Sequence, residues 1–154
     1  MRPEDQYHVG IVVDDLDATL RWYGDVAGYR WCEQYEGDQE LETPDGRVTI
    51  PFRFAYSMDE PRLEVIQSVP GTLWSPADSG LHHLGYWSDD VGGDVAALVA
   101  AGAAVEARAP LPDGSTLWAY CKAAGGARIE LVSSVIRPAM TQWFETGRMP
   151  GQDQ

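Results

Sequence analysis

Two histidines and two glutamates of this sequence could bind a metal ion together: His8, Glu64, His83 and Glu130. Each lies in a segment whose other residues are largely apolar. A carboxylate in an apolar strand is costly unless it is paired, hydrogen-bonded or bound to metal. Two imidazoles and two carboxylates suit Zn, Ni, Co, Mn or Fe better than Ca or an ion that prefers thiolates. Their chemistry would be that of one divalent ion with positions left for water or substrate.

These four residues occupy matching positions because the chain contains an internal repeat. The segment 7–15 (YHVGIVVDD) recurs as 82–90 (HHLGYWSDD), and the segment 62–68 (RLEVIQS) recurs as 128–134 (RIELVSS). A single histidine or glutamate in a strand is more often at the surface or held by hydrogen bonds than a metal ligand. The repeated order His, Glu, His, Glu favours metal binding over that reading.

Each copy predicts a strand, a helix and three further strands. The expected elements are 7–13, 15–28, 29–36, 48–57 and 62–68 in the first copy, and 82–88, 90–102, 103–108, 115–122 and 128–134 in the second. The first copy has a longer middle section, and we expect its charged stretch 36–47, with a Pro-Asp-Gly turn, to be a surface loop. The predicted fold is α+β, with two tandem βαβββ modules forming a cupped mixed sheet around a central metal site.

The whole chain is predicted to form one domain. We expect module one at about 6–70, a linker at about 70–80, module two at about 81–135 and a C-terminal tail at 136–154. Met140, Trp143 and Phe144 of the tail have helical spacing and predict a helix, whereas 147–154 should fray.

Alternation of side chains along a strand places His8 and Gly10 on one face, and His83 and Gly85 on the corresponding face of the second copy. His82 then points away from the metal, and we expect it to pack or to support a ligand; Tyr7 is its counterpart.

Several aromatic side chains are expected near the metal. Trp87 and Tyr120 are candidates for an apolar substrate pocket. Tyr56 matches Tyr120 in the repeat, so duplication alone is an alternative explanation for this pair.

Composition excludes other functions. The net charge of -13 over 154 residues repels phosphate backbones, so nucleic acid is not an expected partner. No apolar run is long enough to span a membrane, and the N-terminus lacks the pattern of a secretory signal. Cys32 and Cys121 stand far apart in sequence and are expected to be reduced thiols. We therefore expect a cytoplasmic protein.

The repeated segments resemble the vicinal oxygen chelate superfamily, which includes glyoxalase I, methylmalonyl-CoA epimerase, extradiol dioxygenases, fosfomycin-resistance transferases and bleomycin-binding proteins. The resemblance covers about residues 6–135, and its most specific parts are 7–17, 63–65, 80–86 and 128–132. The stretch Gly-Leu-His-His at 80–83 is similar to the epimerase branch in particular.

This resemblance implies that the four residues named first are the ligands of one divalent ion, with Glu130, and secondarily Glu64, as the catalytic base. The implied enzyme is a metal-dependent isomerase, epimerase or lyase that abstracts a proton next to a carbonyl of a small organic substrate. The epimerase uses a further glutamate, for which Glu33 is the nearest candidate.

Two alternatives remain open at this point. One is a ring-cleaving extradiol-type dioxygenase, which would use iron, although that branch typically has two histidines and one glutamate. The other is a small-molecule binding or resistance protein without catalysis. Members often form homodimers, which we expect here as well.

Overall fold

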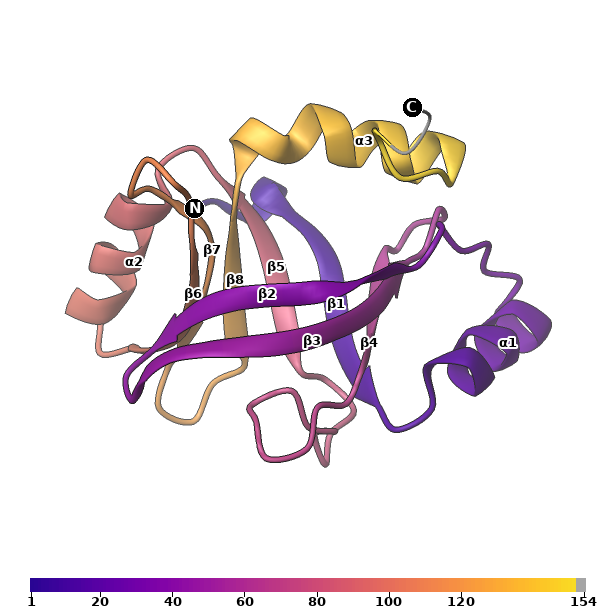
Figure 1. Ribbon diagram of the computed structural model, residues 1–154, viewed down its shortest axis with the longest axis horizontal. Helices are drawn as coiled ribbons and strands as arrows, with labels where there is room; N and C mark the ends of the chain where they lie inside the picture. Colours follow the sequence, from indigo (N-terminus) through magenta and orange to yellow (C-terminus); the bar gives the residue numbers. More distant parts are fainter. Residues whose placement is uncertain (152–154) are drawn as a thin grey trace.

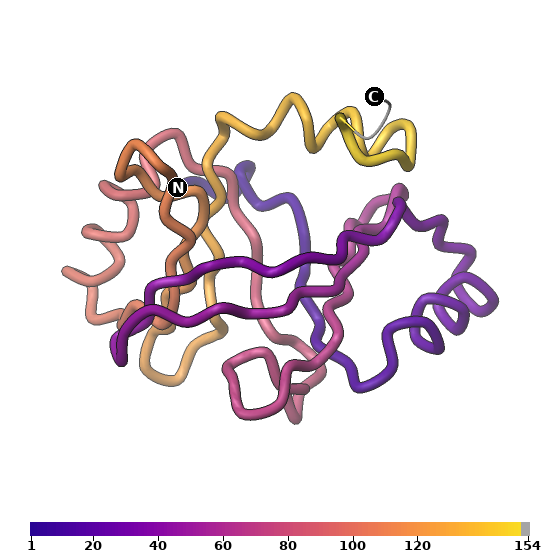
Figure 2. Tube along the Cα trace, in the orientation of Figure 1, coloured from indigo at the N-terminus to yellow at the C-terminus, as the bar shows by residue number. Residues whose placement is uncertain are grey.

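The computed structural model describes residues 1–151. Figures 1 and 2 show the strands curled into a cup, with helices outside it and across one end. The elements are, in order, η1 (Pro3–Asp5), β1 (Gln6–Val13), α1 (Leu16–Ala27), β2 (Tyr35–Thr43), β3 (Gly46–Tyr56), β4 (Leu63–Gln67), β5 (His83–Ser88), α2 (Val91–Ala100), β6 (Ala104–Pro110), β7 (Thr116–Lys122), β8 (Arg128–Ser133), η2 (Ser134–Ile136) and α3 (Arg137–Thr146).

The eight strands form one closed mixed sheet in the order β1-β4-β3-β2-β6-β7-β8-β5. The first four belong to module one and the last four to module two, and each module has the same internal order. The modules join where β1 pairs antiparallel with β5 and where Glu42 of β2 pairs with Arg108 of β6. The predicted α+β fold with two βαβββ modules and a cupped sheet is confirmed.

Helices α1 and α2 lie outside the cup, on opposite sides of it (Figure 1). Each begins at an aspartate whose carboxylate accepts a backbone N–H of the first turn, Asp15 from Ala18 and Asp90 from Gly93, both at 2.9 Å. Their buried residues pack on the outer face of their own module's strands. The inner face of the sheet is thereby left to line the inside of the cup.

The prediction for residues 29–47 is wrong. Residues 36–47 are not a loop: β2 spans Tyr35–Thr43 and forms a long hairpin with β3 (Figure 2), whereas the predicted strand 29–36 is mostly irregular. In β2 the exposed positions alternate with less exposed ones, because Glu36, Asp38 and Glu40 face solvent while the residues between them face inward. The high charge density concealed this alternation of a half-buried strand.

Helix α3 lies across one end of the cup (Figure 1). Its Trp143 and Phe144 are buried, which agrees with the helical spacing in the sequence. The guanidinium of Arg62 lies 3.9 Å from the centre of the Phe144 ring. The same guanidinium donates to the carbonyl oxygens of Ser57 and Met58 in the β3–β4 turn. Arg62 therefore fastens α3 to this turn.

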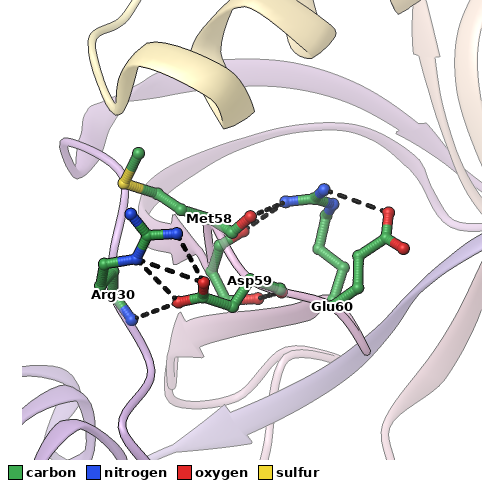
Figure 3. Close-up of polar contacts among 6 residues, drawn as sticks. Arg30, Met58, Asp59 and Glu60 are labelled. Carbon is green, nitrogen blue, oxygen red and sulfur yellow. Dashed lines mark hydrogen bonds and ion pairs between the residues drawn. The ribbon is translucent and has the colours of Figure 1, made fainter.

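The turn is itself held by Arg30, whose side chain and backbone N–H bind the carboxylate of Asp59 (Figure 3). After α3, the carbonyl of Gly147 accepts the N–H of Glu33 at 2.7 Å, and the Glu33 carboxylate accepts the N–H of Met149 at 3.1 Å. The first part of the predicted frayed end, 147–154, is thus anchored. Residues 152–154 lie outside the described residues.

Within residues 1–151, no helix combines the length and the hydropathy that a membrane span requires.

Candidate functional site

The side chains of His8, Glu64, His83 and Glu130 converge on one point inside the cup. All four residues are buried, and one donor atom from each lies within 4.8 Å of every other. His8 Nε2 lies 2.9 Å from His83 Nε2. The Oε2 atoms of Glu64 and Glu130 lie 3.4 and 3.1 Å from His8 Nε2, and 3.0 and 3.5 Å from His83 Nε2. The structure therefore brings together the four residues that the repeat singled out.

Strand register explains this convergence. The central strands β1 and β5 pair so that His8 lies opposite Gly85 and Gly10 lies opposite His83. Gly10 also pairs with Glu64 on β4, and Gly85 pairs with Glu130 on β8. All four side chains consequently lie side by side on the inner face.

The two glycines are required by the close approach of the histidines. A Cβ atom at Gly10 would lie 1.8 Å from the Cε1 atom of His83, and a Cβ at Gly85 would lie 1.9 Å from the Cε1 of His8. Each module's glycine therefore makes room for the histidine of the other module.

The electrostatics of this group favour positive charge. Burial opposes the protonation of His8, but the carboxylates of Glu130 and Glu64 outweigh it and raise the pKa of His8 to about 9. Burial also opposes ionisation of Glu64, but the imidazoles of His8 and His83 outweigh that effect and keep the pKa of Glu64 well below its usual range. Two buried carboxylates require a cation nearby, which can be a proton on His8 or a metal ion.

The spacing of the donor atoms fits a small divalent ion. Four atoms at about 2.1 Å from a common ion stand about 3.0 Å apart in neighbouring octahedral positions and about 3.4 Å apart in tetrahedral ones. The distances from the histidine nitrogens to each other and to the carboxylates, 2.9–3.5 Å, cover this range. The Oε2 atoms of Glu64 and Glu130 are also buried and find no hydrogen-bond donor in the described part of the chain. The group could therefore hold one divalent ion.

His82 supports one of the two histidines. Its Nε2 lies 2.9 Å from the carbonyl oxygen of Leu73, and its Nδ1 lies 3.0 Å from Nδ1 of His83. Burial lowers the pKa of His82 to about 4, so the ring is neutral at pH 7. Because a carbonyl only accepts, His82 carries its proton on Nε2 and accepts one from His83 Nδ1. His83 Nε2 is thereby left with a free lone pair facing the other three ligands.

A cavity of about 220 Å³ lies next to these residues, between the sheet and α3. Glu64 and Glu130 form part of its wall, and most of the rest is aromatic. The aromatic lining residues are Tyr7, Tyr35, Phe52, Phe54, Tyr56, Trp74, Trp118, Tyr120 and Trp143. No lysine or arginine among residues 1–151 lines this cavity.

Of the two residues predicted to line a substrate pocket, Tyr120 lines this cavity and Trp87 does not. Tyr120 lines the cavity, with its ring centre 5.1 Å from that of His83. Trp87 lies outside this lining and stacks on Tyr7 with ring centres 3.9 Å apart. Glu33 is exposed, accepts the N–H of Met149 and does not line the cavity.

Sequence reasoning missed most of the cavity wall, including Gln39 on β2, Trp74 in the segment between the modules, and Met140 and Trp143 on α3. The alternation of charged residues in 35–43 is a signal that could have identified Gln39 as inward-facing. No sequence signal marks Trp74, which stands in a stretch rich in Pro, Gly and Ser.

Comparison with protein families finds a match to the model of the Glyoxalase/Bleomycin resistance protein/Dioxygenase superfamily over residues 7–121. The chain belongs to this superfamily. The match includes β1 and most of both modules and ends in β7, before Glu130. No curated protein sequence is similar enough to count as a relative.

Solved structures share the superfamily fold with this chain. A methylmalonyl-CoA epimerase of Streptomyces coelicolor, in complex with 2-nitronate-propionyl-CoA, has 20% sequence identity and a TM-score of 0.58, covering 84% of this chain and 96% of the other. The methylmalonyl-CoA epimerase of Mycobacterium tuberculosis has 21% identity and a TM-score of 0.55, covering 84% and 87%. A hypothetical protein of Bacillus halodurans has 16% identity and a TM-score of 0.57, covering 83% and 92%. At these sequence identities, the likeness shows a shared fold alone.

Proposed function

We propose that this protein is a metal-dependent enzyme that moves a proton next to a carbonyl group, as an isomerase, epimerase or lyase. The observation that carries the proposal is the convergence of two imidazoles and two carboxylates at the wall of one cavity. The structural neighbours that are methylmalonyl-CoA epimerases, one of them in complex with methylmalonyl-CoA, support the reaction class.

In this proposal, His8, Glu64, His83 and Glu130 hold the ion. When bound, a divalent ion of zinc, nickel, cobalt or manganese supplies a Lewis acid that stabilises negative charge on a carbonyl oxygen. Glu130 takes the proton from the neighbouring carbon: the C–H bond breaks as an O–H bond forms on its carboxylate. The protonated Glu130 then returns the proton to the carbon skeleton of the substrate and regains its charge. Glu64, the matching carboxylate of the other module, is the second candidate base. The aromatic walls exclude water during this exchange.

Four protein ligands argue against the dioxygenase alternative. They leave two positions of an octahedral ion for other groups, whereas the sites of two histidines and one carboxylate in non-haem iron oxygenases keep three. Catechol oxygens and dioxygen together need three. An iron-loaded protein that consumed oxygen with a catechol would reverse this assignment.

Metal content is the first test. Protein purified without chelator or affinity metal should contain about one equivalent of a divalent ion, and the double variant His8→Ala with Glu130→Gln should lose it. The variant Glu33→Gln, which changes an exposed glutamate, is the matched control and should keep its metal. Absence of metal even after reconstitution would contradict the proposal and favour a binding protein whose affinity is insensitive to chelators.

Proton transfer is the second test. The metal-loaded protein in D₂O should exchange the proton next to the carbonyl of a substrate such as a thioester, a 2-oxo acid or an ester, as followed by NMR. Glu130→Gln should slow the exchange by about 10²–10⁴-fold, the usual contribution of a general base. Exchange at the wild-type rate in the double variant of Glu64→Gln and Glu130→Gln would rule out both carboxylates as bases.

A homodimer remains a prediction from the family resemblance. Sedimentation of the metal-loaded protein tests it, and a monomeric mass would contradict it.

A further inference from the structure

The charge of the site restricts its substrate. The two imidazoles bind a metal as neutral ligands, and the carboxylates of Glu64 and Glu130 together contribute two negative charges. A divalent ion bound to all four is then balanced by the protein alone. No net positive charge remains in the site to compensate an anionic substrate group.

The cavity offers no compensation either. None of its lining residues is a lysine or arginine, and Gln39 is the neutral amide among them. Arg62 and Arg137 line a separate hollow beyond Tyr7 and His8. There the Arg62 side chain is engaged by two backbone carbonyls and by the ring of Phe144. An anion placed among the aromatic rings would lose its hydration and meet only neutral donors, with no described side chain of opposite charge beside it.

The shape and chemistry of the walls favour a flat apolar body. An engineered cavity of about 150 Å³ can bind benzene, and the cavity here has about 220 Å³. It therefore has room for one aromatic ring with a short polar substituent. Aromatic walls provide edge-to-face and stacked contacts to such a ring.

Three residues of the cavity wall carry a buried polar atom that has no hydrogen-bond partner among the described residues: Tyr7 with its hydroxyl, and Trp74 and Trp143 with their indole Nε1. The indole Nε1 of Trp143, on α3, is buried and has no hydrogen-bond partner among the described residues. A buried donor without a partner is destabilising. A ligand that carries an acceptor oxygen could satisfy it, and an ordered water would do the same in the empty cavity.

We infer that the substrate is an uncharged carbonyl compound that carries an aryl group and has a second oxygen on the carbon next to the carbonyl, held in the aromatic cavity beneath α3. This inference rests on the proposed function, since the two neighbouring oxygens of the substrate would bind the metal ion that the four polar side chains would hold. It differs from the coenzyme A thioesters of the structural neighbours, whose phosphates would require cationic side chains.

A matched pair of probes tests the inference. Methyl (R)-mandelate and (R)-mandelate share the ring, the stereocentre and the neighbouring oxygens, and differ in charge. We expect the zinc-loaded protein to bind the ester at least about 10-fold more tightly than the anion, measured by calorimetry, because the anion alone pays an uncompensated desolvation cost. Equal or tighter binding of mandelate, or no binding of the ester at millimolar concentration, would overturn the inference.

Substitutions separate the cavity from the rest of the protein. Met140→Lys adds a cation on the half-buried α3 position that lines the cavity and should reverse the preference toward mandelate. Trp143→Ala should weaken the ester about 10-fold through loss of an aromatic contact and a donor. Trp22→Ala, on the exposed face of α1, should change neither affinity. An unchanged preference in Met140→Lys, with the fold intact by circular dichroism, would show that the probes bind elsewhere and overturn the inference.

Proton exchange distinguishes this inference from the proposed function. If the ester binds with the expected preference but its α-proton does not exchange with D₂O, the substrate class stands and the proton-transfer reaction fails. If another carbonyl compound exchanges while the ester does not bind, the reaction stands and the substrate class fails.

Discussion

The two modules place one histidine and one glutamate each in the candidate metal site by the same strand register, but they support their histidines differently. In module two, His82 fixes the orientation of His83 through a chain that ends at the Leu73 carbonyl. In module one, Tyr7 occupies the corresponding position, and Nδ1 of His8 is buried without a hydrogen-bond partner within residues 1–151. The duplication thus preserved the ligands and the glycines but not the hydrogen bonds behind them.

This difference shows which histidine is held by hydrogen bonds in its orientation before a metal binds. A ligand whose second ring nitrogen is held needs little reorganisation when a metal binds. His83 meets this condition through polar contacts. His8 is held by packing instead, with its ring edge-on to Tyr7 at 4.4 Å and to Tyr56 at 5.4 Å between ring centres.

The largest effect is expected from adding a methyl group at either glycine of the central strands. Gly85→Ala should displace His8, and Gly10→Ala should displace His83, because each new Cβ would lie within 2 Å of an imidazole carbon. Metal affinity should fall by more than about 100-fold in both variants. This loss exceeds the roughly 10–100-fold that is usual when a residue hydrogen-bonded to a metal ligand is replaced. Calorimetric titration of the metal-free proteins measures the loss.

Gly24→Ala on α1 is the control, since its nearest contact would be an ordinary 3.5 Å from the carbonyl oxygen of Tyr29. Wild-type affinity in Gly10→Ala or Gly85→Ala would refute the reciprocal packing. A loss in only one of them would break the equivalence of the two modules.

An intermediate effect is expected from removing the polar atoms behind each histidine while retaining a ring. His82→Phe should reduce metal affinity by about 10–100-fold, because His83 loses the acceptor that fixes its tautomer. Tyr7→Phe should change affinity little, because the Tyr7 hydroxyl does not hold His8. In the metal-free protein, the ¹⁵N chemical shifts of His83 should report the Nδ1–H tautomer in the wild type and in Tyr7→Phe, and should depart from those values in His82→Phe. Equal affinity losses in the two variants would contradict the asymmetry.

The smallest effect is expected at the helix caps. Asp15→Ala and Asp90→Ala each remove one carboxylate-to-backbone bond of 2.9 Å. Each should lower the free energy of unfolding by about 1 kcal/mol in urea titrations, since the two caps have the same geometry. Metal affinity should be unchanged, because both helices lie outside the cup. A cap variant that lost metal instead of stability would show that its helix positions the site.

Much of the fold was predictable because the repeat is carried by short-range patterns. Strand alternation and helical periodicity are local signals, and they located β1, α1, β5 and α2 within about two residues. The stretch 36–47 failed because its charges mimic a loop. Only pairing with β3 along nine positions, Tyr35 to Thr43, makes its backbone a strand.

The candidate site was predictable to the level of its four polar side chains, because their positions repeat and their burial requires a shared reason. The cavity was not. Trp74, Trp143 and Gln39 come from a connecting segment, a tail outside the repeat and a strand taken for a loop. Trp87 shares a strand face with His83 but lies behind Tyr7, which a strand pattern cannot reveal.

By itself, the sequence determined the repeat, the faces of its strands and the four polar side chains that converge, because short local patterns repeat at matching positions of the two modules. Only the tertiary structure decided which histidine receives a polar support, which aromatic rings enclose the cavity, and that no lysine or arginine of residues 1–151 lines it. Those properties arise where β1 meets β5 and where α3 closes over the cup, and contacts between residues so distant in sequence leave no periodic trace in it.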